Sequence, residues 1–348
     1  MEEGWRRDGG GMEEGWRTSC SVWPNLDLDV WDLQSELNAV DHRTEPGGAG
    51  RLVVRRGRPF SLKLQSGGFL PDGGVACTAE TGPEPSERYG TRASFGLSAA
   101  VDASRWSAAA TAAPGEPLTL TVCAAPDAPI GRYTLSLGGA GRVHFILLFN
   151  PWCTGDAVFM EDQSGLEEYV TAQDGIVYRG SYKHPVSTPW NYGQFEDGIL
   201  DVCLRILDMN PKHLRNPGKD CSGRRSPVYV SRVLSAMASP GMLCVNCNGD
   251  RGVLLGCWTG DYEGGASPLS WGGSAEILRR WAAAACQPVR YGQCWVFAAV
   301  ACSVSRALGI PCRVVTNYLS AHDNNGDLVI ERHVNEKGEA LQATEMIW

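Results

Sequence analysis

The sequence contains, at residues 290–300, the run Arg290-Tyr291-Gly292-Gln293-Cys294-Trp295-Val296-Phe297-Ala298-Ala299-Val300, in which a cysteine begins an apolar segment. Residues 295–304 contain a single polar side chain, so the run predicts a buried helix. Gly309 and Pro311 follow, as glycine and proline commonly do where a helix ends. Cys294 is therefore predicted to lie in the first turn of this helix.

A cysteine at this position is suited to nucleophilic catalysis. The dipole and the unpaired amides of a helix N-terminus favour the thiolate, which is the nucleophilic form of the side chain. The alternative is a cysteine of the hydrophobic core, because free cysteines are often buried. The flanking Gly292-Gln293 and Trp295 at a predicted helix start favour the nucleophile, and we expect Cys294 to be catalytic.

Four segments in order along the chain resemble a known family. The segment from Tyr291 to Phe297 resembles the active-site signature of the animal transglutaminases, and most nearly of the tissue type. Three further segments carry the resemblance: 190–198 (Trp-Asn-Tyr-Gly-Gln-Phe-Glu-Asp-Gly), 313–318 (Arg-Val-Val-Thr-Asn-Tyr) and 320–323 (Ser-Ala-His-Asp). The match extends from about Leu52 to Trp348 and implies an acyltransferase, a calcium-dependent protein-glutamine gamma-glutamyltransferase.

Composition and charge exclude several classes of protein. The chain has 348 residues, of which 43% are hydrophobic and 20% charged, and is long enough for two domains. Its net charge of -8, without a basic block, argues against nucleic acid as the main partner. No apolar run reaches the roughly eighteen residues of a membrane span. Thirteen cysteines without disulfide-framework spacing, behind an acidic N-terminus, indicate reduced thiols, so we expect a cytoplasmic protein or one exported without a signal peptide.

The predicted organisation has three parts: a disordered appendage at 1–25, a β-sandwich domain at 26–150, and the N-terminal part of a catalytic core at 151–348. The appendage repeats Met-Glu-Glu-Gly-Trp-Arg and has no match in the family. The second part is expected to be all-β, because strand-like runs alternate with Gly- and Pro-rich turns. These runs are 52–56, 60–64, 118–122, 133–137 and 143–149. The resemblance likewise implies an immunoglobulin-like N-terminal sandwich.

Helical patterns appear after residue 150. Apolar side chains at helical spacing predict one helix at 199–207, and Ser226-Pro227 is typical of the cap and first turn of a second. Ser274 is expected to cap a third helix, and residues 313–318 to form a strand after the cysteine helix. This mixture of helices and strands without strict alternation predicts an α+β core. The family's papain-like α+β core agrees with that prediction.

The resemblance assigns roles to two tryptophans. Trp258 matches a residue whose indole N–H stabilises the oxyanion of the reaction, with the backbone N–H of Cys294 as the second donor; an indole only donates. Trp348 matches the opposite wall of the substrate tunnel, which would accept the aliphatic stem of lysine and hold back water. The implied reaction joins a glutamine side chain to a lysine or polyamine amine through a thioester on Cys294, and water as acceptor gives glutamate.

The catalytic base is the main departure from the family pattern. A thiol nucleophile needs a base, usually histidine, and a group that orients it. In the family this histidine follows a tryptophan that matches Trp348, so the histidine, its aspartate and further domains are expected beyond the sequence given, and this chain is expected to be inactive alone. His322, followed by Asp323, is the best internal substitute, although a structural histidine is the commoner finding.

Two loops are candidate calcium sites, and Ca²⁺ is the one cofactor expected. The first loop has oxygen-bearing side chains at alternate positions around a glycine, a pattern that hard cations prefer and that ordinary turns also show. Its residues are Asp323, Asn325 and Asp327, to which the resemblance adds Glu345. The second loop has Asn246, Asn248 and Asp250. Residues 239–244, just before it, look inserted relative to the family.

Two other motifs lack residues that a binding site would need, and two alternative functions remain open. Cys244-Val245-Asn246-Cys247 lacks the second ligand pair of a zinc site, and Gly138-Gly139-Ala140-Gly141 lacks the lysine of a phosphate loop, so we assign neither zinc nor nucleotide. The alternatives are a catalytically silent binding or scaffold protein, acting through its sandwich, and a cysteine protease. The partners expected are proteins with accessible glutamine and lysine, polyamines, and an extracellular-matrix protein at the sandwich.

Overall fold

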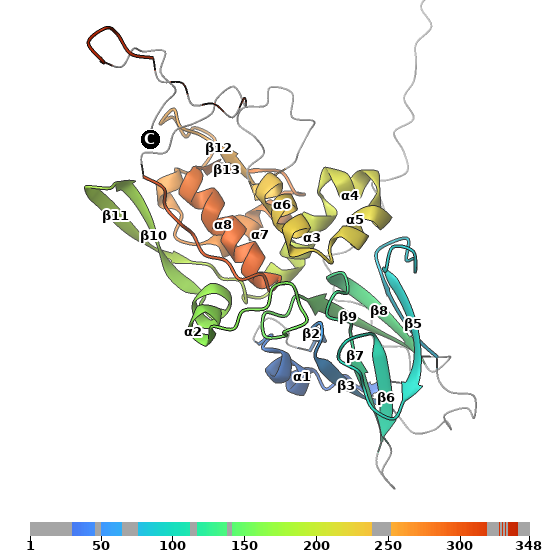
Figure 1. Cartoon of the computed structure of the whole chain (residues 1–348). Coiled ribbons are helices and arrows are strands. Elements are labelled where there is room, and N and C mark those ends of the chain that lie inside the picture. Colours follow the sequence, from blue (N-terminus) through green and yellow to red (C-terminus); the bar gives the residue numbers. More distant parts are fainter. Residues whose placement is uncertain are drawn as a thin grey trace, which may run out of the picture.

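The chain forms an α+β fold in which a β-rich N-terminal part precedes a part of mixed helices and short strands (Figure 1). The computed structural model describes residues 30–45, 50–64, 76–111, 117–137, 141–238, 252–318, 327, 329, 331 and 333–339. The predicted fold class, a β-sandwich followed by an α+β core, is confirmed. The appendage predicted at 1–25 lies outside the described residues.

Among the described residues, the N-terminal strands form a nine-stranded sheet in the order β1-β3-β7-β6-β5-β4-β8-β9-β2. Strand β5 pairs with β4 along most of its length and with β6 at Leu97 and Ser98, so the sheet folds over at β5 into two layers. Side chains from both layers, such as Leu62 and Leu135, fill the core between them. The strands are β1 (Val30–Asp32), β2 (Val53–Arg55), β3 (Pro59–Leu64), β4 (Ala76–Thr81), β5 (Arg92–Ser98), β6 (Ser107–Thr111), β7 (Leu118–Cys123), β8 (Gly131–Leu137) and β9 (Arg142–Leu148).

Helix α1 (Ser35–His42) corrects the expectation that residues 26–150 are all-β. Polar side chains attach it to β3: the Asn38 side chain donates to Ser61 O at 2.8 Å and accepts from Ser61 N at 3.0 Å. His42 Nε2 lies 3.0 Å from Pro59 O, and burial lowers the pKa of His42 to about 4, so its imidazole is neutral at pH 7. Because polar contacts rather than an apolar stripe hold this helix, hydrophobic periodicity does not reveal it.

The helices after residue 150 pack around the long central helix α8 (Cys294–Ala307), which contacts α3, α6 and α7 (Figure 1). The helices predicted at 199–207 and from Ser226 are confirmed as α3 and α6. In the described part of the chain, no helix has the length and apolar character needed to cross a membrane. The other elements are α2 (Gln163–Leu166), the π-helical turn η1 (Glu167–Thr171), β10 (Asp174–Ser181), β11 (His184–Asn191), α3 (Ile199–Asp208), α4 (Pro211–Arg215), α5 (Pro217–Gly223), α6 (Pro227–Ala238), β12 (Leu254–Gly256), the 3-10 turn η2 (Pro268–Ser270), α7 (Ser274–Ala283) and β13 (Val289–Gly292).

Two local expectations in this part are wrong. Ser274 is the first residue of α7 and does not cap it; its buried hydroxyl accepts from Trp190 Nε1 at 2.9 Å and donates to Ala299 O at 3.3 Å. Ser274 therefore links β11, α7 and α8. Residues 313–318 do not form a strand, because no strand among the described residues pairs with them.

A buried ion pair joins the end of β2 to the segment that begins the second part. Arg56 Nε and Nη2 donate to the two carboxylate oxygens of Asp156, each at 2.6 Å, and the two side chains are only 1% and 0% exposed. Arg56 Nη1 also donates to Ala128 O at 2.7 Å. The carboxylate accepts two backbone N–H groups, those of Asn150 and Val158. A buried pair with this many partners is costly to break from one side.

Replacing Arg56 by methionine should lower the free energy of unfolding by about 3–5 kcal/mol, because Asp156 would remain as a buried charge without its partner. The exposed pair between Arg105 and Asp102 provides the control. Arg105→Met should cost less than about 1 kcal/mol, since solvent screens an exposed pair. Urea unfolding of the wild type and both variants measures the difference, and equal losses in the two variants would contradict the prediction.

Candidate active site

The turn from β13 into α8 positions Cys294. Gln293 is extended and precedes the helix, and Cys294 is the first helical residue, as the sequence predicts. The Gln293 carbonyl accepts the N–H groups of Val296 and Phe297 at 2.8 and 3.1 Å, whereas the Cys294 N–H has no acceptor within the described part of the chain. The Cys294 side chain is exposed. Its sulfur and its own N–H group are therefore both available at the helix N-terminus.

Trp258 is brought to this turn because β12 pairs in parallel with β13. The chain leaves β12 at Cys257, whose N–H donates to Gly292 O at 3.2 Å. Gln293 Nε2 donates in return to Cys257 O at 2.7 Å. Two hydrogen bonds thus join the residue before Trp258 to the two residues before Cys294, and the two predicted site residues lie on adjoining segments.

The Trp258 ring is held against the end of β12 while part of it stays in solvent. It lies over Gly256, where an added Cβ would come within 2.2 Å of the ring. Its centroid is 6.1 Å from that of Phe297, on the first turn of α8. The side chain is 38% exposed, which differs from the buried tryptophan of an ordinary core. Only glycine at position 256 leaves room for this ring position.

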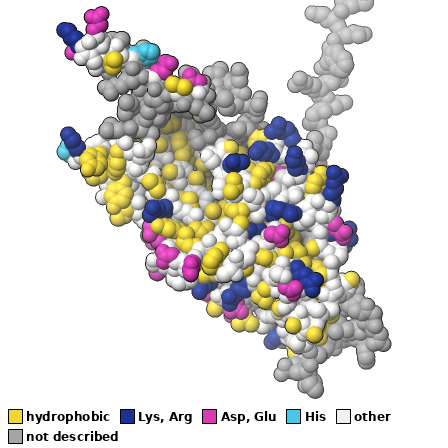
Figure 2. Space-filling model, viewed as in Figure 1, with side chains coloured by type: hydrophobic (Ala, Val, Ile, Leu, Met, Phe, Trp, Pro, Cys, Tyr) yellow, Lys and Arg dark blue, Asp and Glu magenta, His cyan; other side chains and the backbone are white. Residues whose placement is uncertain are grey.

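The β10–β11 hairpin contacts the start of α8 from another direction. The Arg179 guanidinium lies over the Trp295 ring, 5.5 Å from its centroid. Exposed apolar side chains gather on this hairpin, as Figure 2 shows; they include Ile176, Tyr178, Tyr182 and Val186. An exposed apolar surface of this kind is common where proteins contact a partner.

No described histidine lies beside the exposed thiol of Cys294. Five of the six histidines are described, and none lies within hydrogen-bonding distance of Cys294. These five are His42, His144, His184, His213 and His333. His322, the internal substitute considered above, lies outside the described residues.

Most of the predicted calcium ligands also lie outside the described residues. These are Asn246, Asn248, Asp250, Asp323, Asn325 and Glu345, together with the predicted tunnel residue Trp348. Asp327 is described: its side chain is exposed, and Oδ1 accepts the N–H of Val329 at 2.8 Å. The end of this loop therefore carries a solvent-facing carboxylate, which is the type of group that calcium binds.

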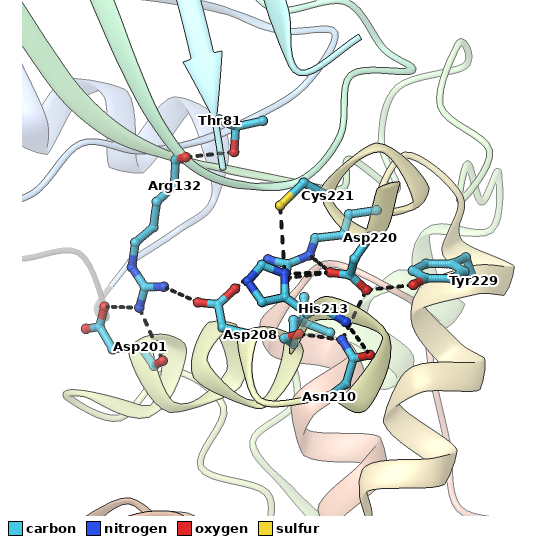
Figure 3. Close-up of polar contacts among 11 residues, drawn as sticks. Thr81, Arg132, Asp201, Asp208, Asn210, His213, Asp220, Cys221 and Tyr229 are labelled. Atoms are coloured by element: carbon cyan, nitrogen blue, oxygen red, sulfur yellow. Dashed lines mark hydrogen bonds and ion pairs between the residues drawn. The ribbon is translucent and has the colours of Figure 1, made fainter. Parts of the chain in front are cut away.

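A buried charged cluster that sequence reasoning missed lies beside α4 and α5 (Figure 3). Asp220 Oδ2 is 3.1 Å from His213 Nδ1 and 2.8 Å from Arg224 Nη2. Asp220 Oδ1 accepts from the Tyr229 hydroxyl at 2.6 Å, and Cys221 Sγ lies 4.0 Å from His213 Nδ1. The local signal was two Asn-Pro pairs, at 210–211 and 216–217, which begin the short helices that carry these side chains.

This cluster has metal-binding side chains, but an arginine already supplies the positive charge. Ligand atoms of His213, Asp220 and Cys221 lie within 4.8 Å of one another. Arg224 Nη2 lies 3.0 Å from His213 Nδ1, and Arg224 Nη1 lies 2.8 Å from Asp208. A guanidinium therefore neutralises the carboxylates at the place where a cation would bind. We interpret the cluster as structural.

The cluster favours a protonated histidine. Burial lowers the pKa of His213, but hydrogen bonds with Asp220 and Cys221 outweigh burial and hold the pKa at about 9. Burial raises the pKa of Asp220, yet its bonds with His213 and Arg224 bring that pKa well below its usual range. The folded state therefore binds a proton on His213 at neutral pH more fully than the unfolded chain does, since an ordinary histidine pKa is near 6.5.

Two family models match the sequence. Residues 29–138 match an N-terminal model of the transglutaminase family, and residues 272–345 match a core model of the transglutaminase-like superfamily. The first covers most of the β-layered part, and the second covers α7, β13, α8 and the segment beyond them. Cys294 lies inside the second match.

Relatives and a solved structure agree with these matches. Protein-glutamine gamma-glutamyltransferase 2 of Cavia cutleri is 52% identical over 336 residues, which is 93% of this chain and 48% of the relative. The Homo sapiens protein of the same name is 51% identical over 335 residues, again 93% of this chain and 48% of the relative. The crystal structure of red sea bream transglutaminase matches with a TM-score of 0.78 and 40% identity, covering 92% of this chain and 47% of that one. The chain thus spans about half the length of the relatives it matches.

The stability that His213 contributes should depend on pH. Its folded-state pKa lies above the unfolded value, so the contribution is complete below about pH 6.5 and is lost as pH rises through about 9. His213→Gln should lower the free energy of unfolding by about 1–2 kcal/mol at pH 6, and by much less at pH 10. Urea unfolding at both pH values measures this. His184→Gln, at an exposed position in the hairpin, is the control, and an equal His213→Gln effect at both pH values would contradict the assignment.

Cys294 should react with iodoacetamide faster than the buried thiols. It is exposed at a helix N-terminus, whereas Cys203 on α3 is buried and its pKa is raised by burial. We expect alkylation of Cys294 to be at least about tenfold faster than that of Cys203. Mass spectrometry of tryptic peptides at early times measures both rates. Equal rates would show that the helix start is not the accessible thiol site.

Proposed function

Because the chain belongs to the transglutaminase family, we propose that it carries the nucleophile of a calcium-dependent protein-glutamine gamma-glutamyltransferase. The observation that carries the proposal is the exposed Cys294 at the start of a buried helix, with Trp258 on the adjoining segment. A cysteine of the hydrophobic core would be shielded from substrate. This one is exposed, and its own N–H has no acceptor among the described residues.

The proposed reaction has two acyl-transfer steps. In the first, Cys294 Sγ attacks the carbon of a glutamine side-chain amide; the C–S bond forms, the C–N bond breaks, and nitrogen leaves as ammonia after it takes up a proton. In the second, a lysine or polyamine amine attacks the thioester carbon; the new C–N bond, an isopeptide bond, forms, the C–S bond breaks, and the sulfur leaves as the thiol with a proton from the amine. Water in place of the amine gives glutamate. No cofactor enters either covalent step.

The oxyanion that forms in each step needs hydrogen-bond donors. The Cys294 N–H is available at the helix start, and we propose Trp258 Nε1 as the second donor. An indole N–H donates without accepting, so it does not compete for the proton of the thiol. Donors that are fixed before the reaction stabilise developing charge at little reorganisation cost. The hydrogen bonds of Cys257 with Gly292 and with the Gln293 side chain would fix the position of Trp258.

The catalytic base would come from outside the described residues, since none of the described histidines contacts Cys294. We propose that the base is a histidine oriented by an aspartate, as in the family pattern, rather than His322, and that the 348-residue chain alone shows no measurable turnover. This observation also favours the second candidate, a catalytically silent binding protein that acts through the β-layered part. The two candidates differ in whether Cys294 is used.

Calcium would bind two loops of the chain and would not enter the covalent steps. The donor set Asp323, Asn325, Asp327 and Glu345 consists of hard oxygen ligands, which fits Ca²⁺, and the exposed Asp327 carboxylate is consistent with it. Asn246, Asn248 and Asp250 would form the second site. Bound calcium supplies positive charge that holds such carboxylates together.

Substrates and location follow from the same proposal. The acyl donors and acceptors would be proteins with accessible glutamine and lysine, and free polyamines; the exposed apolar hairpin near Trp295 is a surface against which a protein substrate could pack. We propose a reducing compartment, the cytoplasm. The described cysteines other than Cys286 are free thiols, which supports this. A matrix protein would bind the β-layered part.

Calcium-dependent incorporation of a labelled primary amine into a glutamine-rich protein tests the proposal. The chain should be inactive, and a version extended with the histidine-bearing segment of the family should be active only with calcium. Cys294→Ala in the extended version should abolish incorporation, because no thioester can form. Activity that survives Cys294→Ala would exclude the proposal. Inactivity of a folded, calcium-loaded extended version would favour the silent binding protein.

A further inference from the structure

The chain turns back on itself at the end of α8 and brings a second cysteine beside the helix. The reversal occurs at Gly309, whose φ of 90° is a conformation that glycine adopts readily. Ile310 N–H then donates to Ser305 O at 2.9 Å, and Arg306 Nε donates to Cys312 O at 2.8 Å. Residues 310–312 therefore lie along the last turns of the helix and are held there by these bonds.

This return places the Cys302 thiol in contact with the backbone of Cys312. Cys302, on α8, donates from Sγ to Cys312 O at 3.4 Å, so its sulfur lies against the residue that carries the second thiol. Cys302 is buried at 1% exposure, whereas Cys312 is half-buried. Both are free thiols in this structure. A small oxidant would therefore reach Cys312 first.

The environments of Cys302 and Cys312 shift the pKa values of their thiols in opposite directions. The hydrogen bond from Cys302 is the main cause that lowers the pKa of Cys312 to about 7; Ser305 and Arg306 add to it, and burial opposes it. The same bond and burial raise the pKa of Cys302. Near neutral pH a substantial share of Cys312 is thus thiolate, while Cys302 keeps its proton.

We propose that Cys302 and Cys312 form a reversible disulfide, a modification site separate from Cys294, when the chain meets a peroxide. In the first step the Cys312 thiolate attacks one oxygen of hydrogen peroxide; the S–O bond forms, the O–O bond breaks, and the leaving hydroxide takes up a proton as water. Cys312 is then a sulfenic acid. In the second step Cys302 sulfur displaces hydroxide from Cys312 sulfur, and the Cys302 proton leaves with it as water. One peroxide is reduced, and two thiols are oxidised.

The disulfide would fix the exit from α8. Beyond Cys312 the chain is attached through the Cys312 N–H to Tyr169 O at 3.0 Å and through Thr316 Oγ1 to Tyr178 O at 2.6 Å, and then leads toward the loop 323–327. A covalent bond to α8 adds an attachment that local opening cannot break. Residues 310–318 should therefore open less often in the oxidised chain.

Peptide mapping of the full chain tests the proposal. The Cys294→Ala variant is used, because residue 294 lies on the same tryptic peptide as Cys302. The folded chain is treated with hydrogen peroxide, denatured, alkylated with iodoacetamide and digested with trypsin, which cuts after Arg306 and Arg313. The expected product links peptide 291–306 to peptide 307–313, and dithiothreitol should separate the two. Alkylation at both cysteines should fall together by about tenfold or more.

Two variants and one internal standard decide the outcome. In Cys312→Ala, Cys302 should be alkylated as fully as Cys203 on α3. Cys203 is also buried, has no partner thiol among the described residues, and should stay reduced throughout. In Cys302→Ala, Cys312 should proceed to irreversible sulfinic acid, because the second thiol is missing. Hydrogen exchange of residues 310–318 should slow when the Cys294→Ala chain, with Cys302 and Cys312 intact, is oxidised. The proposal is overturned if the oxidised Cys294→Ala chain gives no linked peptide, or if its Cys302 remains as available to alkylation as Cys203.

Discussion

Burial of helix α8 is the constraint on which the candidate site depends. Its side chains from Val296 to Ala307 fill the core between α3, α6 and α7, and each large apolar group buried there contributes roughly 1.5–3 kcal/mol. Packing on several sides prevents this helix from sliding along its own axis. Its first residue follows β13 after a single extended residue, Gln293, so the place of Cys294 is set by the core and not by a mobile loop.

Charged groups, in contrast, join the β layers to the helices. Arg56 and Asp156 form a fully buried pair, and Arg132 on β8 reaches both Asp201 and Asp208 on α3. The contact between Arg132 and Asp208 is drawn in Figure 3. Asp208 in turn pairs with Arg224, which belongs to the buried cluster around Asp220. Ion pairs resist sliding more than apolar contacts do, because their geometry is specific. The β layers therefore hold α3 in place, and α3 packs on the helix that carries Cys294.

Where a signal was local, the sequence predicted the structure. The apolar run after Cys294 and the breakers beyond it predicted α8, and similar patterns predicted α3 and α6. Strand β6 was missed because Ser-Ala-Ala-Ala-Thr has little strand propensity; its conformation comes from pairing with β7. Residues 313–318 show the reverse: β-branched side chains predicted a strand, but no described strand pairs with them.

The candidate site likewise combines a feature that local sequence predicts with others that depend on long-range contacts. A cysteine at a helix start is visible in the sequence, whereas the position of Trp258 beside it depends on the parallel pairing of β12 with β13, whose sequence separation is more than thirty residues. Ser274 was misjudged because a distant partner, Trp190, takes the hydroxyl that would have capped α7. The cluster around Asp220 draws side chains from three helices, so no single stretch displays it. Long-range contacts of this kind cannot be deduced from local pattern.

The central claim is that Cys294 accepts an acyl group with help from Trp258, and acylation by 4-nitrophenyl acetate tests it most directly. The activated ester has a good leaving group, so acylation needs no histidine to protonate it. We predict an acetyl thioester on peptide 291–306 that Cys294→Ala removes and that Trp258→Phe, which keeps the aromatic contact but lacks the N–H, forms about tenfold or more slowly. Acetylation spread over other cysteines, or an unchanged rate in Trp258→Phe, would contradict the account.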